Sequence, residues 1–319
     1  MLEPRKPGEP ALVTLGCMNF GKRTPAPESE RIVARALERG VTLFDTANVY
    51  NDGESERILG RALRAAGARA RSKIATKVGL ARVAGRPEGL SREAIHRAID
   101  ESLGRLGTDH VDVYYLHAPD HAVPIEETLG AMEELRAAGK IGALGVSNYA
   151  AWQILEMMGV PGAPRPAVSQ VMYNLLIRQI EIEYVGFTRR YPIHTTVYNP
   201  LAGGLLTGQH AGAGTGEPPH GSRFDKNRMY QGRYWSPAFF AQVDAYRALA
   251  AELGTSLAAL SYGWLAAQPH VDSILAGPGS VEHLDAALDG VATVIPAAAL
   301  GRIDEIHRAH TGTDASYVR

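Results

Sequence analysis

The strongest constraint on the fold is a regular alternation along the chain, in which short apolar, β-branched runs are followed by longer amphipathic segments. The strand-like runs occupy residues 11–15, 41–45, 73–77, 111–116, 141–146, 167–172, 193–198 and 272–276. Helical patterns separate many of them, at about residues 28–39, 54–65, 91–106, 124–139, 150–158 and 179–190. Strands that alternate with helices indicate parallel crossovers. Eight such units predict an α/β fold, a (β/α)8 TIM barrel.

A doubly wound open sheet is the alternative fold, because it shows the same alternation. Such a sheet usually has fewer strands and a glycine-rich first turn of the form GxGxxG. The first turn of this chain, residues 16–21, is Gly-Cys-Met-Asn-Phe-Gly and does not match that pattern. The barrel is therefore favoured, as a single domain over residues 1–319.

One long segment, after the seventh strand, interrupts the alternation. Residues 203–235 are rich in glycine, proline and polar residues and show no clear periodicity. A long loop inside a barrel usually carries function, and the alternative is a disordered insertion. Its aromatic and arginine side chains favour a loop that docks on the barrel: Arg223, Phe224, Tyr230, Arg233, Tyr234 and Trp235.

Charge and cysteine content argue against several classes of protein. Lys+Arg 33 against Asp+Glu 34 gives a formal net charge of -1, whereas a dedicated nucleic-acid binder usually carries a strong basic excess. The single cysteine, Cys17, excludes an intrachain disulfide and a cysteine-rich metal site. The first residues do not resemble a signal peptide, and no apolar stretch is long enough for a membrane span. We therefore expect a soluble cytoplasmic protein with no nucleic-acid, membrane or metal partner.

Four titratable residues come at the ends of three consecutive strands. Asp45 ends the second strand with Tyr50 five residues later, Lys77 ends the third, and His117 follows the fourth. In a barrel the carboxyl ends of the strands form one rim, where active sites lie. Each residue alone is more commonly structural, since a strand-end aspartate often caps a helix and a lone tyrosine or histidine usually packs. Together they predict a catalytic site.

The lysine and the carboxylate predict a buried ion pair, because a buried charge needs a partner. A free phenol has a pKa of about 10, and a nearby ammonium group lowers it. We therefore expect Lys77 to lower the pKa of Tyr50 and make it a better proton donor, with Asp45 keeping Lys77 charged and oriented. His117 would hydrogen-bond a carbonyl oxygen placed between it and Tyr50. This arrangement suits acid-assisted delivery of hydride to a carbonyl.

Four motifs that carry or accompany these residues resemble the signature of the aldo-keto reductases. They are residues 44–60 (Phe-Asp-Thr-Ala-Asn-Val-Tyr-Asn-Asp-Gly-Glu-Ser-Glu-Arg-Ile-Leu-Gly), 75–79 (Ala-Thr-Lys-Val-Gly), 115–117 (Tyr-Leu-His) and 145–149 (Gly-Val-Ser-Asn-Tyr). The resemblance covers the whole chain in the right order, and it implies a barrel that binds a nicotinamide cofactor without a Rossmann fold. It implies catalytic roles for Asp45, Tyr50, Lys77 and His117, with Tyr50 as the general acid. The implied reaction is NADPH-dependent reduction of aldehydes, and of ketones, to alcohols.

The resemblance also assigns cofactor-binding residues. Ser147, Asn148 and Gln170 would hold the nicotinamide carboxamide, since hydroxyl and amide groups supply matching donors and acceptors, and Tyr198 would stack on the nicotinamide ring. Residues 198–208 would surround the pyrophosphate, because glycine lets backbone N–H groups approach phosphate oxygens. The residues assigned to the pyrophosphate are Asn199, Pro200, Leu201, Gly203, Gly204 and Leu205, with Arg223 from the long loop.

Within the family, the same run resembles the aflatoxin-aldehyde and succinic-semialdehyde reductase branch. Residues 230–235 and 316–319 agree with that branch, in which arginines bind carboxylate-bearing substrates through paired hydrogen bonds. The resemblance therefore implies carboxylate-bearing or aromatic aldehydes as substrates, a C-terminal tail over the active site, and a monomer or homodimer. The alternative for the C-terminal arginine is a frayed chain end. The implied substrate-binding residues are Met18, Tyr230, Arg233 and Arg319.

The adenosine end departs from the family pattern. Residues 277–287 follow the eighth strand, where a helix N-terminus suits a phosphate, and Gly277, Ser280 and His283 are the implied cofactor-binding residues. NADP-preferring relatives usually have Arg or Gln at the position of His283 and Asn at the position of Ala287. His283 can donate a hydrogen bond and Ala287 cannot, so we expect NADPH to be held more weakly here and NADH to be accepted as well.

Two other classes of function remain open. Relatives that serve as potassium-channel beta subunits keep the same four catalytic residues, so a nucleotide-sensing regulatory subunit with weak turnover is an alternative. Turnover of an aldehyde with NADPH separates the two. A metal-dependent barrel hydrolase is a second alternative, because His117, Asp120 and His121 are close in the sequence. No further ligand pattern appears at the other strand ends, and activity that survives a chelator would exclude it.

Overall fold

Eight parallel strands close into a barrel. The computed structural model describes residues 2–210 and 216–313. The barrel strands are β1 (Leu12–Gly16), β2 (Leu43–Asp45), β3 (Lys73–Val78), β6 (Val111–Leu116), β7 (Ile141–Ser147), β8 (Val168–Met172), β9 (His194–Tyr198) and β10 (Ser273–Ala276). They pair in the closed order β1-β10-β9-β8-β7-β6-β3-β2. The predicted (β/α)8 barrel is confirmed, and each predicted strand lies within two residues of its observed bounds.

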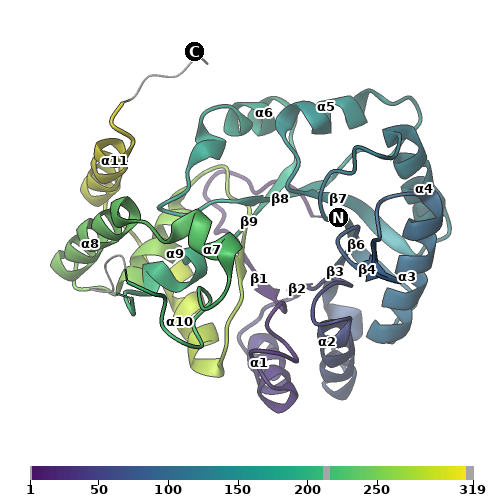
Figure 1. Cartoon of the computed structure of the whole chain (residues 1–319), viewed down its shortest axis with the longest axis horizontal. Helices are drawn as coiled ribbons and strands as arrows, with labels where there is room; N and C mark the ends of the chain where they lie inside the picture. Colours follow the sequence, from purple (N-terminus) through teal and green to yellow (C-terminus); the bar gives the residue numbers. More distant parts are fainter. Residues whose placement is uncertain (1, 211–215, 314–319) are drawn as a thin grey trace.

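Helices surround the strands (Figure 1). They are α1 (Ala26–Glu38), α2 (Glu54–Ala65), α3 (Arg92–Leu106), α4 (Ile125–Ala137), α5 (Ala151–Gly159), α6 (Tyr184–Arg190), α7 (Arg228–Tyr234), α8 (Pro237–Glu252), α9 (Leu257–Ala267), α10 (Val281–Val291) and α11 (Ala297–Thr311). Serine side chains cap several of them, since Ser91, Ser256 and Ser280 each accept a hydrogen bond from a backbone N–H of the first turn. A short hairpin, β4 (Arg82–Val83) and β5 (Arg86–Pro87), follows β3, and a 3-10 turn, η1 (Arg69–Arg71), precedes it.

The helix predicted at residues 179–190 is divided in the structure. A 3-10 turn, η2 (Gln179–Glu181), precedes the shorter α6. The Glu181 carboxylate is held by Arg178 at 2.8 Å and by the Tyr173 hydroxyl, and Glu183 has a non-helical backbone with φ -135°. These tertiary contacts hold the turn against the barrel, so the α-helix begins only at Tyr184. The prediction of one continuous helix is therefore wrong.

The segment after β9 is more regular than its sequence predicts. It contains a 3-10 helix, η3 (Ala202–Thr207), and α7, whose start is capped by the Asn227 side chain. Phe224 and Tyr234 are fully buried, and the Trp235 ring lies 4.9 Å from the rings of both Phe224 and Phe240. The prediction that this segment docks on the barrel is confirmed for its described part. The predicted long loop also contains the short helix α7, which this aromatic packing stabilises.

The N-terminal segment covers the end of the barrel opposite the carboxyl ends of the strands. The Arg5 backbone N–H donates to one oxygen of Asp272 at 2.7 Å, and the Thr195 backbone N–H donates to the other at 2.6 Å. The His194 ring contacts the carbonyl oxygen of Glu3 at 2.8 Å. These bonds tie the segment to the first residues of β9 and β10, so the proposed site lies at the other end.

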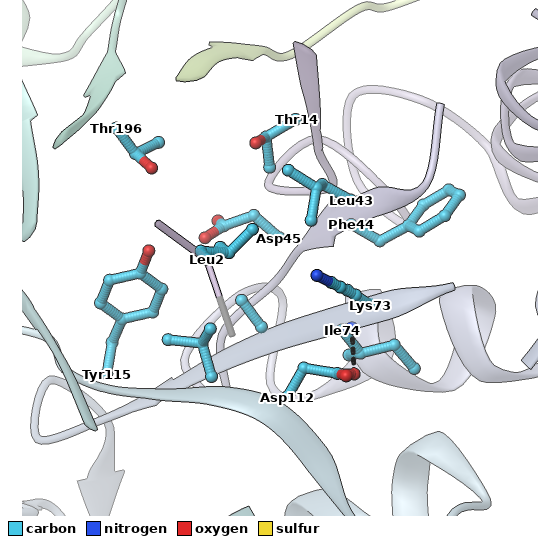
Figure 2. Close-up of a pocket in the computed structure, with 12 residues that line it drawn as sticks. Leu2, Thr14, Leu43, Phe44, Asp45, Lys73, Ile74, Asp112, Tyr115 and Thr196 are labelled. Carbon is cyan, nitrogen blue, oxygen red and sulfur yellow. Dashed lines mark hydrogen bonds between the residues drawn. The ribbon is translucent and has the colours of Figure 1, made fainter. Parts of the chain in front are cut away.

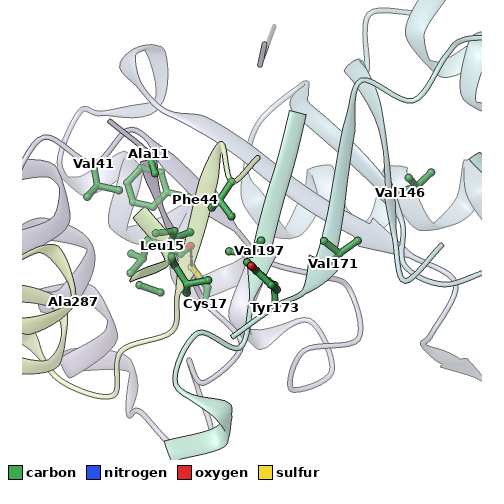
Figure 3. Close-up of a cluster of buried hydrophobic side chains, with 14 of the residues drawn as sticks. Ala11, Leu15, Cys17, Val41, Phe44, Val146, Val171, Tyr173, Val197 and Ala287 are labelled. Atoms are coloured by element: carbon green, nitrogen blue, oxygen red, sulfur yellow. Dashed lines mark hydrogen bonds between the residues drawn. The ribbon is translucent and has the colours of Figure 1, made fainter. Parts of the chain in front are cut away.

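The main hydrophobic core lies between the strands and the helices. Figure 3 shows part of it, in which Leu15, Cys17 and Phe44 lie beside one another. The Cys17 side chain is fully buried, and burial raises the pKa of its thiol well above its ordinary value. Cys17 is therefore a packed, neutral thiol. Among the residues that the structure describes, no helix is long and apolar enough to cross a bilayer.

Candidate active site

A buried ion pair lies at the carboxyl ends of β2 and β3. Asp45 is opposite Ala75, so Lys77, two residues further along β3, points to the same face of the sheet. The Lys77 side chain is fully buried and donates to Asp45 Oδ1 and, at 2.8 Å, to the carbonyl oxygen of Thr46. Each charge is compensated, as burial requires. The structure thus brings together the pair that the sequence predicts.

The Tyr50 ring lies against Lys77. Residues 51–53 (Asn-Asp-Gly), which follow it, have φ values of 51°, 53° and 79°, a conformation that asparagine, aspartate and glycine adopt more readily than other residues. The Asn51 side chain also donates to the Phe20 carbonyl oxygen at 2.6 Å, which ties this turn to the loop after β1. Lys77 Nζ is 5.0 Å from the centroid of the Tyr50 ring. The tight turn therefore holds the phenol beside the ammonium group.

The pKa of Tyr50 shifts in the direction opposite to the prediction. Burial raises the pKa of the phenol, and the Lys77 ammonium group offsets only part of that rise. The predicted net decrease is wrong because the fold desolvates the ring as well as the lysine. Burial acts to lower the pKa of Lys77, but Asp45 and Tyr50 outweigh it, and the net shift is upward. The protein therefore holds a protonated lysine beside a neutral phenol.

His117 follows β6 and meets the Tyr50 ring edge-on. The two ring centroids are 5.8 Å apart, with an interplanar angle of 80°. The imidazole is buried, and within the described part of the chain its Nδ1 atom has no hydrogen-bond partner. Burial, with a smaller contribution from Lys77, lowers the pKa of His117 to about 3. The ring is therefore neutral near pH 7, with one nitrogen able to donate and the other to accept.

Polar side chains at the ends of β7 and β9 face the same rim. The Asn148 amide nitrogen donates to the His117 carbonyl oxygen at 2.9 Å and to Ser147 Oγ at 3.2 Å. The Asn148 oxygen accepts from the Tyr198 hydroxyl at 2.7 Å. An amide oxygen accepts two hydrogen bonds, so one acceptor position of Asn148 remains for a ligand. Ser147 is buried, and the Tyr198 ring is half-buried at the rim.

Gln170, on β8, lies next to the ion pair. Its Nε2 atom donates to Asp45 Oδ2 at 2.8 Å, and the residue is 4% exposed. The sequence assigns Gln170 to the nicotinamide carboxamide, and the structure adds a direct contact with Asp45. The Asp45 carboxylate is thus bound by an amide on one oxygen and by an ammonium group on the other.

The run after β9 turns sharply through residues in the left-handed region. Asn199, Gly203 and Gly204 have φ values of 62°, 70° and 108°, and the Asn199 side chain accepts from the Gly203 N–H at 2.8 Å. A Cβ atom on Gly203 would lie 2.8 Å from Tyr230 Cδ1, so glycine is needed for its backbone and for space. Leu201 and Leu205, also assigned to the pyrophosphate, have half-buried and buried side chains and can offer it only their backbone N–H groups, whereas the buried Pro200 has no N–H group to donate.

Two arginines of the long segment lie near the Tyr230 ring. The guanidinium carbons of Arg223 and Arg233 are 5.5 Å and 5.9 Å from its centroid. Arg223 also donates to Asn19 Oδ1 at 2.6 Å, next to Met18, whose side chain is 37% exposed. Among the described residues neither arginine forms an ion pair, so both can serve an anionic ligand. Arg319 and the predicted C-terminal tail over the site lie outside the described residues.

The chain is similar in sequence to known proteins. The aldo/keto reductase family model matches residues 12–308. The chain belongs to the aldo/keto reductase family. It is 38% identical over 300 residues to the human aflatoxin B1 aldehyde reductase member 2. The matched region covers 88% of this chain and 82% of that protein. It is also 38% identical over 296 residues to the human aflatoxin B1 aldehyde reductase member 4, covering 86% and 87%.

A plant protein with a different name is also similar to this aldo/keto reductase. The probable voltage-gated potassium channel subunit beta of Oryza sativa subsp. japonica is 34% identical over 267 residues, covering 82% of this chain and 80% of that protein. The family resemblance predicted from the motifs is confirmed by these comparisons. The chain is an NAD(P)H-dependent oxidoreductase.

In this aldo/keto reductase, the loop that the sequence assigns to the adenosine end follows β10 and leads into α10. Ser280 Oγ accepts from the His283 backbone N–H at 3.3 Å, and the His283 side chain is exposed. The Gly277 carbonyl oxygen accepts from the Asn19 side chain at 3.3 Å. Ala287 is 2% exposed and packs in the core. Ser280 and His283 therefore lie at the helix start as the sequence predicts, while Ala287 faces the protein interior.

Glu28 of α1 reaches this same helix start, which the sequence reasoning missed. Its Oε1 atom accepts from the Val281 backbone N–H at 3.1 Å, and its Oε2 atom pairs with Arg31 at 2.7 Å. A helix N-terminus favours an anion, and here the Glu28 carboxylate already accepts a hydrogen bond from one of its N–H groups. No local pattern could reveal this contact, because the partners are 253 residues apart.

Tyr115 is a second missed residue, and the sequence does hold a signal for it. Side chains alternate along a strand, so Tyr115 points to the same side of β6 as His117. It is 2% exposed, and its ring centroid is 5.7 Å from Lys77 Nζ. Figure 2 shows its hydroxyl directed toward Asp45 and Thr196. The strand period therefore places the Tyr115 side chain near the ion pair as well.

Proposed function

We propose that this chain catalyses the NADPH-dependent reduction of aldehydes to alcohols, with Tyr50 as the general acid. The observation that carries the proposal is the contact of Tyr50 with the buried Lys77 ammonium group, which is paired with Asp45. An ammonium group beside a phenol stabilises the phenolate that forms as the proton leaves. The identity of 38% to proteins named aldehyde reductases supports the same class of substrate.

Each of the four residues has one task at the carbonyl group. Tyr50 Oη donates the proton that becomes the hydrogen of the new hydroxyl group. Lys77 stays protonated and stabilises the developing phenolate, and Asp45 holds Lys77 in place. His117, neutral because of its burial, donates a hydrogen bond that orients the carbonyl oxygen. The site thus places donors and positive charge where negative charge develops.

The residues present fit a nicotinamide dinucleotide. When bound, NADPH supplies the hydride that reduces the carbonyl carbon. The remaining acceptor position of Asn148 suits a carboxamide NH2 group, and Ser147 and Gln170 lie beside it on the same rim. Tyr198 offers a half-buried ring for stacking. For the other end, we assign the pyrophosphate to the left-handed backbone at Gly203 and Gly204, because residues without a side chain allow a close approach.

The loops supply the residues that we assign to the anionic groups of the cofactor and the substrate. Arg223 would bind the diphosphate, because it is desolvated enough to lower its pKa and forms no ion pair among the described residues. Gly277, Ser280 and His283 would hold the adenosine phosphate at the start of α10. Arg233 would bind a substrate carboxylate.

Apolar and aromatic side chains complete the proposed substrate pocket. Tyr230 lies between Arg223 and Arg233, and Met18 is exposed in the loop after β1. Aromatic surface beside a guanidinium suits an aldehyde that carries a ring or a carboxylate. We therefore propose carboxylate-bearing or aromatic aldehydes as substrates.

A steady-state panel tests the proposal. Aldehydes with and without a carboxylate are assayed with NADPH and with NADH, and Tyr50→Phe serves as the matched variant. We expect turnover by the wild type, and in Tyr50→Phe a loss of kcat of about 10³-fold with an unchanged cofactor Kd, measured by fluorescence quenching. Normal turnover in Tyr50→Phe would contradict the role of Tyr50. A wild type that reduces no carbonyl compound would contradict the proposed activity.

The alternative is a nucleotide-sensing regulatory subunit. The identity of 34% to a probable potassium channel subunit beta favours it. Such a subunit would bind NADPH tightly and turn over aldehydes slowly. The same panel therefore separates the two functions by the ratio of kcat to cofactor affinity.

A further inference from the structure

Glu88 carries a buried carboxylate that the proposed chemistry of the four catalytic residues does not use. It follows the exposed hairpin of β4 and β5, yet its side chain is only 2% exposed. A buried carboxylate needs an opposite charge or hydrogen bonds to compensate it. Arg97 of α3 supplies the charge, but its Nη2 atom lies 3.8 Å away, too far for a hydrogen bond. Hydrogen bonds from other groups must therefore hold the carboxylate.

The two segments that carry the tyrosine and the lysine of the site supply those hydrogen bonds. Asn48 lies two residues before Tyr50, and its Nδ2 atom donates to both oxygens of the carboxylate, at 3.0 Å and 2.9 Å. Gly79 lies two residues after Lys77, and its backbone N–H donates to Oε2 at 2.8 Å. One carboxylate thus joins the segment of the phenol to the segment of the ammonium group.

Backbone hydrogen bonds fix the groups that meet there. The Asn48 N–H donates to the Lys77 carbonyl oxygen at 3.3 Å, and the Glu88 N–H donates to the Ala81 carbonyl oxygen at 2.9 Å. Gly79 has a φ of +114°, a conformation that a residue without a side chain adopts readily. The 3.3 Å bond is long for an N–H to oxygen contact, so the three bonds of the carboxylate are the stronger connection between the segments.

Packing alone does not account for the asparagine at position 48. The residue is 6% exposed, and its amide oxygen has no hydrogen-bond partner among the described residues. A buried acceptor without a partner is unfavourable, and an apolar side chain of similar size would avoid that cost. Its NH2 group, by contrast, is directed at the Glu88 carboxylate, which accepts only from donors. The contact with Glu88 is therefore the feature that an amide at this position provides.

We propose that Glu88 is a positioning residue that joins the Tyr50 segment to the Lys77 segment. Through its bonds to Asn48 and Gly79 it fixes the position of the phenol relative to the ammonium group, whose Nζ atom is 5.0 Å from the ring centroid. A general acid acts only within hydrogen-bond reach of the atom it protonates, so a small displacement slows the reaction. This effect on turnover rests on the proposed function.

The competing role is that Glu88 only anchors the hairpin. Such a residue would change the free energy of unfolding but leave the folded enzyme with its normal rate. A positioning residue instead lowers the rate of the chemical step and leaves the affinities for aldehyde and cofactor in place, because other groups bind them. The single-turnover rate of NADPH oxidation, measured by stopped flow, reports that step even where product release limits kcat.

Glu88→Ala tests the proposal, with Arg97→Gln as the matched control. We expect the single-turnover rate of Glu88→Ala to fall about tenfold, with the Kd of NADP+ and of the aldehyde within about twofold of the wild type. Arg97→Gln removes the charge beside the same carboxylate but none of its hydrogen bonds, and it should leave the rate unchanged. Asn48→Ala keeps the bond to Gly79 and should lower the rate about threefold, so it serves if Glu88→Ala does not fold.

A reversed pair tests the contact itself. Asn48→Asp alone places two carboxylates together and should lower the rate more than Asn48→Ala. Adding Glu88→Gln lets the new amide donate to the new carboxylate and accept from the Gly79 N–H. We expect this double variant to return to within about threefold of the wild-type rate. A folded Glu88→Ala with the wild-type rate, or a double variant as slow as Asn48→Asp, would overturn the proposal and leave Glu88 an anchor of the hairpin.

One measurement keeps the test independent of turnover. In protein labelled with 13C-tyrosine, the Cζ resonance of Tyr50, assigned with Tyr50→Phe, reports the position of the ammonium group beside the phenol. It should move in Glu88→Ala and stay in place in Arg97→Gln. A wild type that reduces no aldehyde would contradict the proposed function instead. The resonance would then still decide the role of Glu88, because an unchanged resonance in Glu88→Ala would overturn it.

Discussion

The two ends of the proposed cofactor site differ in how their charges are held. At the barrel centre, Lys77 is fully buried and bonded to Asp45 and to the Thr46 carbonyl oxygen. At the start of α10, Glu28 and Arg31 pair with side chains 23% and 67% exposed. A buried pair is costly to break, whereas solvent screens an exposed pair. We therefore expect the strands to determine the chemistry and surface side chains to adjust the cofactor preference.

Lys77→Met should have the largest effect, at the buried end. Removing one partner of a buried ion pair leaves an uncompensated charge and destabilises the fold by about 3–5 kcal/mol. We expect the free energy of unfolding, measured by urea titration, to fall by that amount and turnover to be lost. Asp45→Asn/Lys77→Met removes both charges and should recover much of the stability but none of the turnover. Equal free energies of unfolding in Lys77→Met and in the double variant would show that an unpaired Asp45 charge costs little. The charges at the buried end would then be held no more tightly than those at the exposed end.

His117 predicts a pH dependence that belongs to the buried end. Its pKa is about 3 in the folded chain because of burial and Lys77, whereas an unfolded histidine has a pKa of about 6.5. Between these values the unfolded chain binds a proton that the folded chain does not, so stability is lost as the pH falls. The loss approaches about 1.4 kcal/mol per pH unit.

His117→Gln isolates this contribution. The free energy of unfolding of the wild type, minus that of the variant, should shrink as the pH falls from about 6.5 towards about 3. Other buried histidines contribute equally to both proteins and cancel. A difference that stays constant over this range would mean that His117 is not desolvated in the folded chain.

The same contrast separates what the sequence can predict about the site from what it cannot. Asp45, Lys77 and His117 are predictable because strand ends share one rim of a barrel. The direction of the pKa shift of Tyr50 is not, because it depends on how deeply the fold buries the ring. The contact of Glu28 with Val281 is not predictable either, since it joins two helices far apart in the chain.

The fold shows a similar division. The strands, predicted within two residues of their observed bounds, and α2, predicted with the observed bounds, follow from local periodicity. Helix α9 does not, because residues from Leu260 to Leu265 are all buried and leave no polar face to mark a helical period. The break between η2 and α6 depends on the contacts of Glu181 with Arg178 and Tyr173. Where tertiary contacts override the local pattern, the sequence alone predicts the wrong element.

Arg233 tests the region between the two ends. It lies 5.9 Å from the Tyr230 ring centroid and forms no ion pair among the described residues. We expect Arg233→Ala to raise KM about tenfold for a carboxylate-bearing aldehyde and less than about twofold for an uncharged one. Arg228→Ala, at an exposed position in the first turn of the same helix, is the control and should change neither. Equal effects on both aldehydes would assign Arg233 to packing.

Glu28→Gln should have the smallest effect, at the exposed end. Glu28 accepts from the Val281 N–H at 3.1 Å, at the helix start where the adenosine phosphate of NADPH is expected. Its charge repels a phosphate there, and glutamine keeps an acceptor without the charge. We expect the Kd of NADP+ at low salt to fall about threefold and that of NAD+ to stay unchanged. Glu30→Gln is the control, because Glu30 lies on the same helix, α1, is exposed and pairs with Arg61.

The salt dependence of this variant decides whether the two ends differ as proposed. A screened surface charge loses its influence as ionic strength rises, so the gain in NADP+ affinity should shrink from low to high salt. The buried Lys77–Asp45 pair should not respond to salt over the same range, so kcat at saturating cofactor should stay unchanged. A Glu28→Gln variant that tightens NADP+ and NAD+ equally would make Glu28 a helix-packing residue, and cofactor preference would then depend on Ser280 and His283.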